Sequence, residues 1–357
     1  MLKTLALVSV LVLVATPALA FHDGGVAHCN GCHTMHNSQD GALVDPDSPG
    51  GNPWLLVDAT PSETCLGCHA TGLGASFGSD PLAPPPEKGA GNFVFLTEDN
   101  LNDGHAGAAN PIPGDAAGHN INAPSYGVGP DATLTSAPGG AFPASQMECS
   151  SCHDPHGTDE FRLLYTAGQE VQGGLATFLN PAPDAEGISI FFGSEADDNH
   201  TAYKGGMSAW CGNCHGDFHA NNDDLVHPSG QAIGADIAQN YNVYNGTADL
   251  TGGAQGTAYL AAVPFEDPAS TTSSTAGPTA SSQVSCISCH RAHATSSPDA
   301  GRWDFNVTVL SEDGAESGAY AIPNPYGDPN QRSLCNKCHV QDEFDADVVA
   351  PAPTGVR

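Results

Sequence analysis

The chain has 357 residues, and its 40 acidic and nine basic side chains give a formal net charge of −31 at neutral pH. Such a charge excludes nucleic-acid binding, which needs a basic surface, and favours solubility and attraction to cationic partners. Glycine and proline contribute 42 and 28 residues. No segment keeps a sustained helical or strand periodicity, which excludes a fold built on long regular elements.

The first twenty residues have the pattern of an export signal. A basic residue, Lys3, precedes the apolar stretch 5–14, and small residues at 18–20 form a cleavage site. The apolar stretch is too short to span a bilayer, and no other segment of the sequence is long enough. We therefore predict a signal peptide at residues 1–20 and a secreted mature chain, residues 21–357, that forms a single domain without a membrane span.

Six times along the mature chain, two cysteines stand three positions apart and a histidine directly follows the second. We number these motifs 1 to 6 in chain order. Their cysteines are Cys29 and Cys32, Cys65 and Cys68, Cys149 and Cys152, Cys211 and Cys214, Cys286 and Cys289, and Cys335 and Cys338. The histidines that follow are His33, His69, His153, His215, His290 and His339. This is the attachment signature of c-type haem: two thioether bonds hold the porphyrin, and the adjacent, proximal histidine ligates the iron.

Other uses of paired cysteines fit these motifs poorly. A disulfide framework does not require six identical spacings, and zinc sites do not place a histidine after every second cysteine. All twelve cysteines belong to the motifs, so the sequence predicts six covalently bound c-type haems. The motifs have no constant period, which argues against a repeat solenoid. We expect the fold of a multihaem c-type cytochrome, loop-rich with few short helices and strands wrapped around a chain of haems, and unfolded without them.

Histidines are also the predicted second ligands of the irons. Ten histidines remain beside the proximal six, whereas the mature chain has only three methionines. Bis-histidine ligation predicts low-spin irons with potentials below those of His/Met cytochromes. Four of the spare histidines follow a proximal histidine by three or four residues: His36, His156, His219 and His293. In a helical turn they would share its face, so each can reach only a neighbouring iron.

Three further histidines, His22, His119 and His227, are the other predicted distal ligands. Together with the four above they make seven candidates for six irons. We expect His28, His105 and His200 to be ordinary surface residues.

Several runs of the sequence go well beyond the haem signature. They occupy residues 21–27, 32–38, 137–143, 149–157, 206–211, 289–294 and 334–339. With these runs the chain resembles the OmcS-like extracellular hexahaem cytochromes, whose subunits polymerise into conductive filaments in metal-reducing bacteria. The resemblance implies closely spaced bis-histidine haems, a loop-rich fold and head-to-tail assembly. It also implies that His36 crosses the subunit boundary and ligates the haem of His290 in the neighbouring copy, a contact that need not close into a ring.

The leading interpretation is therefore an electron carrier, not an enzyme. It would act outside the cell as a filament of its own copies, receiving electrons from partner cytochromes and passing them to metal oxides, electrodes or partner cells. One alternative is a monomeric periplasmic or cell-surface shuttle, which would use His36 internally. A multihaem oxidoreductase is disfavoured, because such an enzyme needs an open iron position and all six motifs here end in histidine. The acidic clusters at 195–198 and 223–224 are interpreted as solvated surface, because no loop has calcium-ligand spacing.

Overall fold

The computed structural model describes residues 29–71, 75–78, 89–98, 101–102, 111–171, 173–188, 195–220, 229–312 and 325–339. The predicted signal peptide lies outside these residues, as do His22, His28, His105 and His227.

Regular structure is sparse in the described residues. The α-helices are α2 (Pro61–His69), α3 (Met207–Cys211), α4 (Asp217–Ala220), α5 (Gly234–Val243) and α6 (Cys286–Cys289). The strands form four two-stranded antiparallel sheets: β1 (Ser38–Gln39) with β2 (Ala42–Leu43), β3 (Leu101–Asn102) with β4 (Pro111–Ile112), β5 (Glu170–Val171) with β6 (Ala176–Thr177), and β7 (Asp184–Glu186) with β8 (Ala202–Gly205). This confirms the predicted loop-rich fold.

Short 3-10 helices supply most of the remaining turns. They are η1 (Cys29–Gly31), η2 (Pro53–Leu55), η3 (Phe93–Thr97), η5 (Gly114–Ala116), η6 (Pro124–Tyr126), η7 (Ala144–Gln146), η8 (Cys149–Ser151), η9 (Phe161–Leu163), η11 (Gln255–Thr257), η12 (Pro298–Ala300), η13 (Leu310–Glu312) and η14 (Leu334–Lys337).

Each haem motif forms one helical turn. In motifs 1 and 3 to 6, the histidine N–H donates to the carbonyl of the first cysteine at 2.8 to 3.1 Å. In motif 2 the turn is the last turn of α2. This helix begins at Pro61, after the N-cap residue Thr60, whose side chain accepts a hydrogen bond from the Glu63 N–H. Such a turn brings residues three and four positions apart onto one face, so both cysteines and the histidine can meet one porphyrin.

The core is divided into small clusters that border the motifs. One contains Phe93, Phe95 and Ile121 and packs against Cys149. Another contains Tyr241 and Trp303 and packs against one cysteine each of motifs 5 and 6, Cys289 and Cys338. Apolar side chains therefore gather where the cysteines present their sulfur atoms, as a haem-centred fold requires.

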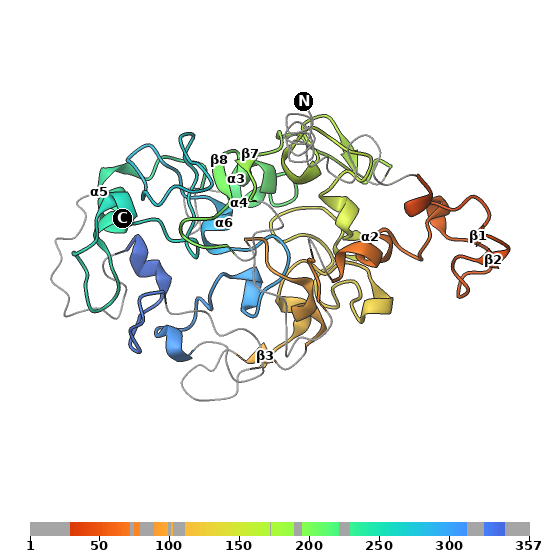
Figure 1. Cartoon of the computed structure of the whole chain (residues 1–357), viewed down its shortest axis with the longest axis horizontal. Helices are drawn as coiled ribbons and strands as arrows, with labels where there is room; N and C mark the ends of the chain where they lie inside the picture. Colours follow the sequence, from red (N-terminus) through yellow and green to blue (C-terminus); the bar gives the residue numbers. More distant parts are fainter. Residues whose placement is uncertain are drawn as a thin grey trace, which may run out of the picture.

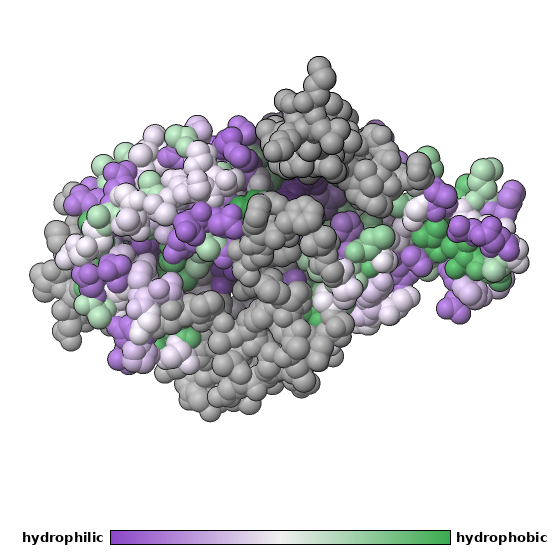
Figure 2. All heavy atoms as spheres, in the orientation of Figure 1, coloured by the Kyte–Doolittle hydropathy of each residue, from purple (hydrophilic) through white to green (hydrophobic). Residues whose placement is uncertain are grey.

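The molecule is elongated, with the segment that carries β1 and β2 projecting from one end and α5 near the other (Figure 1). We call residues 34–57 the arm. Apolar surface is visible on it in Figure 2, and its exposed side chains include Met35, Leu43, Trp54 and Leu55. Large apolar side chains held in solvent often mark a surface that another molecule covers.

Candidate haem sites

The six motifs lie beside one another in chain order. Cysteine thiols of successive motifs lie close enough for one to shift the pKa of the other. The interacting pairs are Cys32 with Cys68, Cys65 with Cys149, Cys152 with Cys214, Cys211 with Cys286, and Cys289 with Cys335. The attachment sites thus form a row from motif 1 to motif 6.

Motifs 2 and 3 are joined in the same way as motifs 4 and 5. The Ser62 hydroxyl, three residues before Cys65, accepts from the Cys149 N–H at 3.1 Å. The Ser208 hydroxyl, three residues before Cys211, accepts from the Cys286 N–H at 3.2 Å. A serine therefore fixes the spacing within each pair of attachment sites.

A buried carboxylate supports each of these two junctions. Glu148 accepts from the Ser62 N–H at 3.0 Å, and Glu266 accepts from the Met207 N–H at 2.7 Å. Burial raises the pKa of both carboxyl groups. Each junction therefore combines a serine–cysteine hydrogen bond with a buried glutamate that accepts a backbone N–H at or next to that serine.

Motifs 1, 3 and 5 share a second feature, a returning segment beside the proximal histidine. The bridges pair His33 with Leu56, His153 with Leu164, and His290 with Gly301. Just before each bridge, two non-glycine residues adopt left-handed φ angles between 53° and 59°: Trp54 and Leu55, Arg162 and Leu163, and Asp299 and Ala300. Such a conformation is costly outside glycine and points to a functional constraint. The sequence carries no clear signal for it.

The left-handed turn orients the proximal ring. In each case the carbonyl of the first left-handed residue lies at the Nδ1 atom of the histidine: His33 with Trp54 at 3.0 Å, His153 with Arg162 at 2.8 Å, and His290 with Asp299 at 2.9 Å. His119 and His215 use the carbonyls of Ala292 and Pro138 in the same way. An Nδ1–H that donates to a carbonyl leaves Nε2 as the basic nitrogen, the arrangement typical of metal-binding histidines.

Three pairs of histidines face one another across a gap that suits an iron atom. The ring centroids are 6.3 Å apart for His33 and His156, 5.9 Å for His119 and His215, and 6.5 Å for His153 and His293. Two imidazoles on opposite sides of one metal, each with a metal–nitrogen bond of about 2 Å, have centroids about 6 Å apart. The residues present therefore fit bis-histidine haems at motifs 1, 4 and 3.

Burial keeps several of these rings in the form that binds metal. It lowers the pKa of His119 to about 4 and that of His293 to about 3, and it also lowers the pKa of His153. The imidazoles are thus neutral at pH 7, with a lone pair available for an iron.

The chain is similar to proteins that carry such motifs. Residues 142–171, which contain motif 3, match the family described as "Doubled CXXCH motif". The chain is 34% identical to the C-type cytochrome OmcS of Geobacter sulfurreducens, over 93% of this chain and 96% of that protein. The chain belongs to the OmcS family of c-type cytochromes.

Two solved structures support this assignment. One is an outer membrane cytochrome S filament from Geobacter sulfurreducens, with 32% identity and a TM-score of 0.75. The other, of OmcS nanowires from the same organism, has 31% identity and a TM-score of 0.76. Each match covers 90% of this chain and 100% of the other. This confirms the family resemblance and the fold, and the six motifs of this OmcS-family cytochrome carry six covalently bound haems c.

The structure of this OmcS-family chain places three of the seven predicted distal ligands opposite a proximal histidine and does not do so for the other four. His119, His156 and His293 each lie opposite a proximal histidine, as described above. His36 is exposed on the arm. The resemblance pairs it with His290, whose ring centroid lies 5.4 Å from that of Phe305. His219 belongs to α4, and only its backbone is described; His22 and His227 lie outside the described residues. The ligand roles of all seven stay predictions.

The expectation for His200 was wrong in one respect. Its side chain is fully buried, not on the surface. Its Nδ1 and Nε2 atoms lie 3.0 Å and 2.8 Å from the carbonyls of Thr201 and Ser274, and its ring stacks on Tyr259 at 3.7 Å. Because carbonyls occupy both nitrogens, His200 holds two loops together and has no nitrogen left for a metal.

Motif 6 contains a buried cation. Burial lowers the pKa of Lys337 to about 8, so its ammonium group stays protonated at neutral pH.

Within the described residues, no helix is long and apolar enough to cross a membrane.

Proposed function

We propose that this cytochrome carries electrons outside the cell along a head-to-tail filament of its own copies, delivering them to metal oxides, electrodes or partner cells. The row of six attachment sites supports conduction, because adjacent haems would be close enough for electron hopping. The OmcS relatives of known structure are a filament and nanowires, and similarity extends over nearly the whole chain. Export through the predicted signal peptide and supply of electrons by partner cytochromes belong to the same proposal.

One observation carries the filament: the histidine three residues after a motif lies opposite the proximal histidine two motifs earlier. His156 follows motif 3 and faces His33 of motif 1, and His293 follows motif 5 and faces His153 of motif 3. In a head-to-tail filament, the motif two places before motif 1 is motif 5 of the preceding copy. The same relation would therefore place His36 opposite His290 of that copy. His36 and His290 are both exposed in a single copy.

A ligand bond from His36 of one copy to the haem of His290 in the preceding copy would join successive copies in a fixed direction. Such a heterologous contact joins different surfaces of two identical subunits and extends without closing. The exposed apolar side chains of the arm would become buried in the same contact (Figure 2). Covering them would stabilise the assembly by the hydrophobic effect.

The remaining irons limit the other ligand assignments. If His156, His293 and His119 serve motifs 1, 3 and 4, and His36 serves motif 5, then motifs 2 and 6 still need ligands. His22, His219 and His227 are our three candidates for these two irons. With every iron ligated on both sides no open position remains for a substrate, so we propose an electron carrier rather than an enzyme.

The test is His36→Ala in the secreted, haem-loaded protein, examined by electron cryo-microscopy and by optical and electron paramagnetic resonance spectroscopy. We expect short filaments or none, and one of the six haems in the high-spin state. Gln39→Ala, on the same exposed arm, is the matched control and should retain filaments. Intact filaments with six low-spin haems in the His36 variant would overturn the cross-subunit ligand. Discrete wild-type particles with six low-spin haems would favour a monomeric shuttle.

A further inference from the structure

Motif 6 differs from the other five in the residues between its cysteines. Motifs 1 to 5 have only uncharged residues at the two intervening positions, whereas motif 6 has Asn336 and Lys337. The lysine therefore places a positive charge within the short loop to which the sixth haem is attached.

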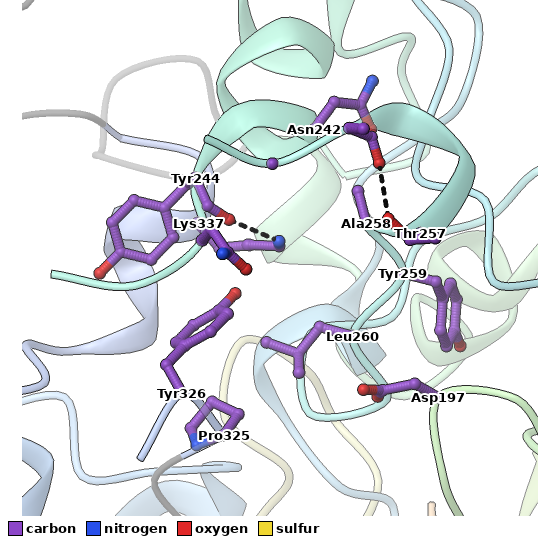
Figure 3. Close-up of a pocket in the computed structure, with 13 residues that line it drawn as sticks. Asp197, Asn242, Tyr244, Thr257, Ala258, Tyr259, Leu260, Pro325, Tyr326 and Lys337 are labelled. Carbon is purple, nitrogen blue, oxygen red and sulfur yellow. Dashed lines mark hydrogen bonds between the residues drawn. The ribbon is translucent and has the colours of Figure 1, made fainter. Parts of the chain in front are cut away.

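The charge of Lys337 is held inside the protein. The residue is 2% exposed, and its Nζ atom donates to the carbonyl of Tyr244 at 3.0 Å (Figure 3). Nζ also lies 4.5 Å from the ring centroid of Tyr241 and 5.6 Å from that of Tyr326. A carbonyl dipole and aromatic faces stabilise a cation without cancelling its charge.

No described carboxylate forms an ion pair with this ammonium group; the lysine ion pair in the described part of the chain is that of Lys204 with Glu186. Asp197 lines the same cavity, of about 190 Å³, but its side chain is exposed and accepts from the Ala261 N–H (Figure 3). Because solvent screens an exposed carboxylate far more than a buried ammonium, a net positive field remains at motif 6.

We propose that Lys337 raises the reduction potential of the haem attached to motif 6. Reduction adds one electron to a ferric haem, with no bond broken and the electron supplied by the neighbouring haem or by an external reductant. A fixed buried cation stabilises that added negative charge, and the low dielectric of the interior strengthens the effect. Lys337 acts through its field and is a tuning residue, not a ligand.

The position of motif 6 gives the charge a directional effect. Cys289 of motif 5 is the neighbour of Cys335, so motif 6 is the last site of the row within one copy. A raised potential at that site makes electrons collect there before they leave. This inference does not require the filament, since it concerns the order of potentials within one copy.

The experiment is a spectroelectrochemical titration of the full-length, haem-loaded Lys337→Met variant. The step that belongs to motif 6 is identified as the one missing from a Cys335→Ala/Cys338→Ala variant. In Lys337→Met this step should move to lower potential by at least a tenfold change in its reduction equilibrium, about 59 mV for one electron. Haem content, measured as the pyridine haemochrome, should remain at six per chain. Lys337→Arg keeps the charge and should keep the potential.

Lys204→Met is the matched control, because it removes the same charge from a partly exposed lysine whose Nζ lies 3.8 Å from Glu186. It should leave the motif 6 step in place. An unchanged motif 6 step in a six-haem Lys337→Met protein would overturn the proposal, and so would an equal shift in Lys204→Met. If Lys337→Met does not retain its haems, Lys337→Gln, which keeps an N–H donor for the Tyr244 carbonyl, gives the same test: the step should fall, and a fixed step contradicts the proposal.

Discussion

His156 faces His33 across 6.3 Å, with their ring planes only 5° apart, although the two residues follow different haem motifs. The offset of His156 from His153 had indicated that it serves a neighbouring iron. In the structure it faces the proximal histidine of motif 1, two motifs earlier in the chain. The motif that precedes a histidine therefore does not show which motif that histidine faces.

The pairing of His156 with His33 can be tested by substitution. We expect His156→Ala to turn one of the six haems high-spin, because one side of its iron loses a ligand. The change should appear in the electron paramagnetic resonance spectrum and disappear when Cys29 and Cys32 are also replaced by alanine. Loss of the high-spin signal on replacing Cys149 and Cys152 instead would assign His156 to its own motif and refute the pairing.

Ser62→Ala tests the junction between motifs 2 and 3. The Ser62 hydroxyl accepts from Cys149 N–H and donates to Glu148, so its removal leaves buried polar groups without a partner. The expected loss is about 1–3 kcal/mol in the free energy of unfolding, measured by denaturant titration. Ser208→Ala should show a similar loss at the equivalent junction, whereas Ser38→Ala, exposed on the arm, should change stability little. Equal values for Ser62 and Ser38 would contradict this role.

Glu148 predicts a pH dependence of stability. Burial raises its pKa in the folded protein above the value of an unfolded glutamate, about 4.3. Between these two pKa values the folded state binds more protons than the unfolded state, so stability falls as pH rises through this window and stays lower above it. Glu148→Gln should remove that loss, with its stability advantage over wild type growing from about pH 4.3 upward. Glu170→Gln, exposed in β5, serves as the control; a constant difference between Glu148→Gln and wild type across this range would refute the prediction.

His200 should behave as a structural residue. Its two ring nitrogens lie at hydrogen-bond distance from the carbonyls of Thr201 and Ser274, and a glutamine amide, whose two N–H groups share one nitrogen, cannot reach both. We expect His200→Gln to cost about 1–3 kcal/mol in unfolding free energy while all six haems stay low-spin. A high-spin haem in this variant would show instead that His200 acts on an iron.

The motifs made the cofactors and the loop-rich fold predictable, because C-x-x-C-H fixes a covalent chemistry that local sequence contains in full. The offset of His156 and His293 predicts that each serves an iron other than that of its own motif, and in the structure they face the proximal histidines of motifs 1 and 3. The order of the attachment sites was not predictable, since it depends on contacts between distant segments, such as Cys65 with Cys149. The burial of His200 was missed for the same reason: the loop that carries Ser274 covers it.

The crossed arrangement of the histidines has a consequence for biogenesis. With iron bound between His33 and His156, and between His153 and His293, each metal would connect two distant parts of the chain. If a single haem were not loaded, the segment carrying its distal histidine would be released, and that segment also carries the attachment motif of another haem. We therefore expect partially loaded chains to be prone to proteolysis during maturation, so that the cell accumulates either the complete six-haem protein or none.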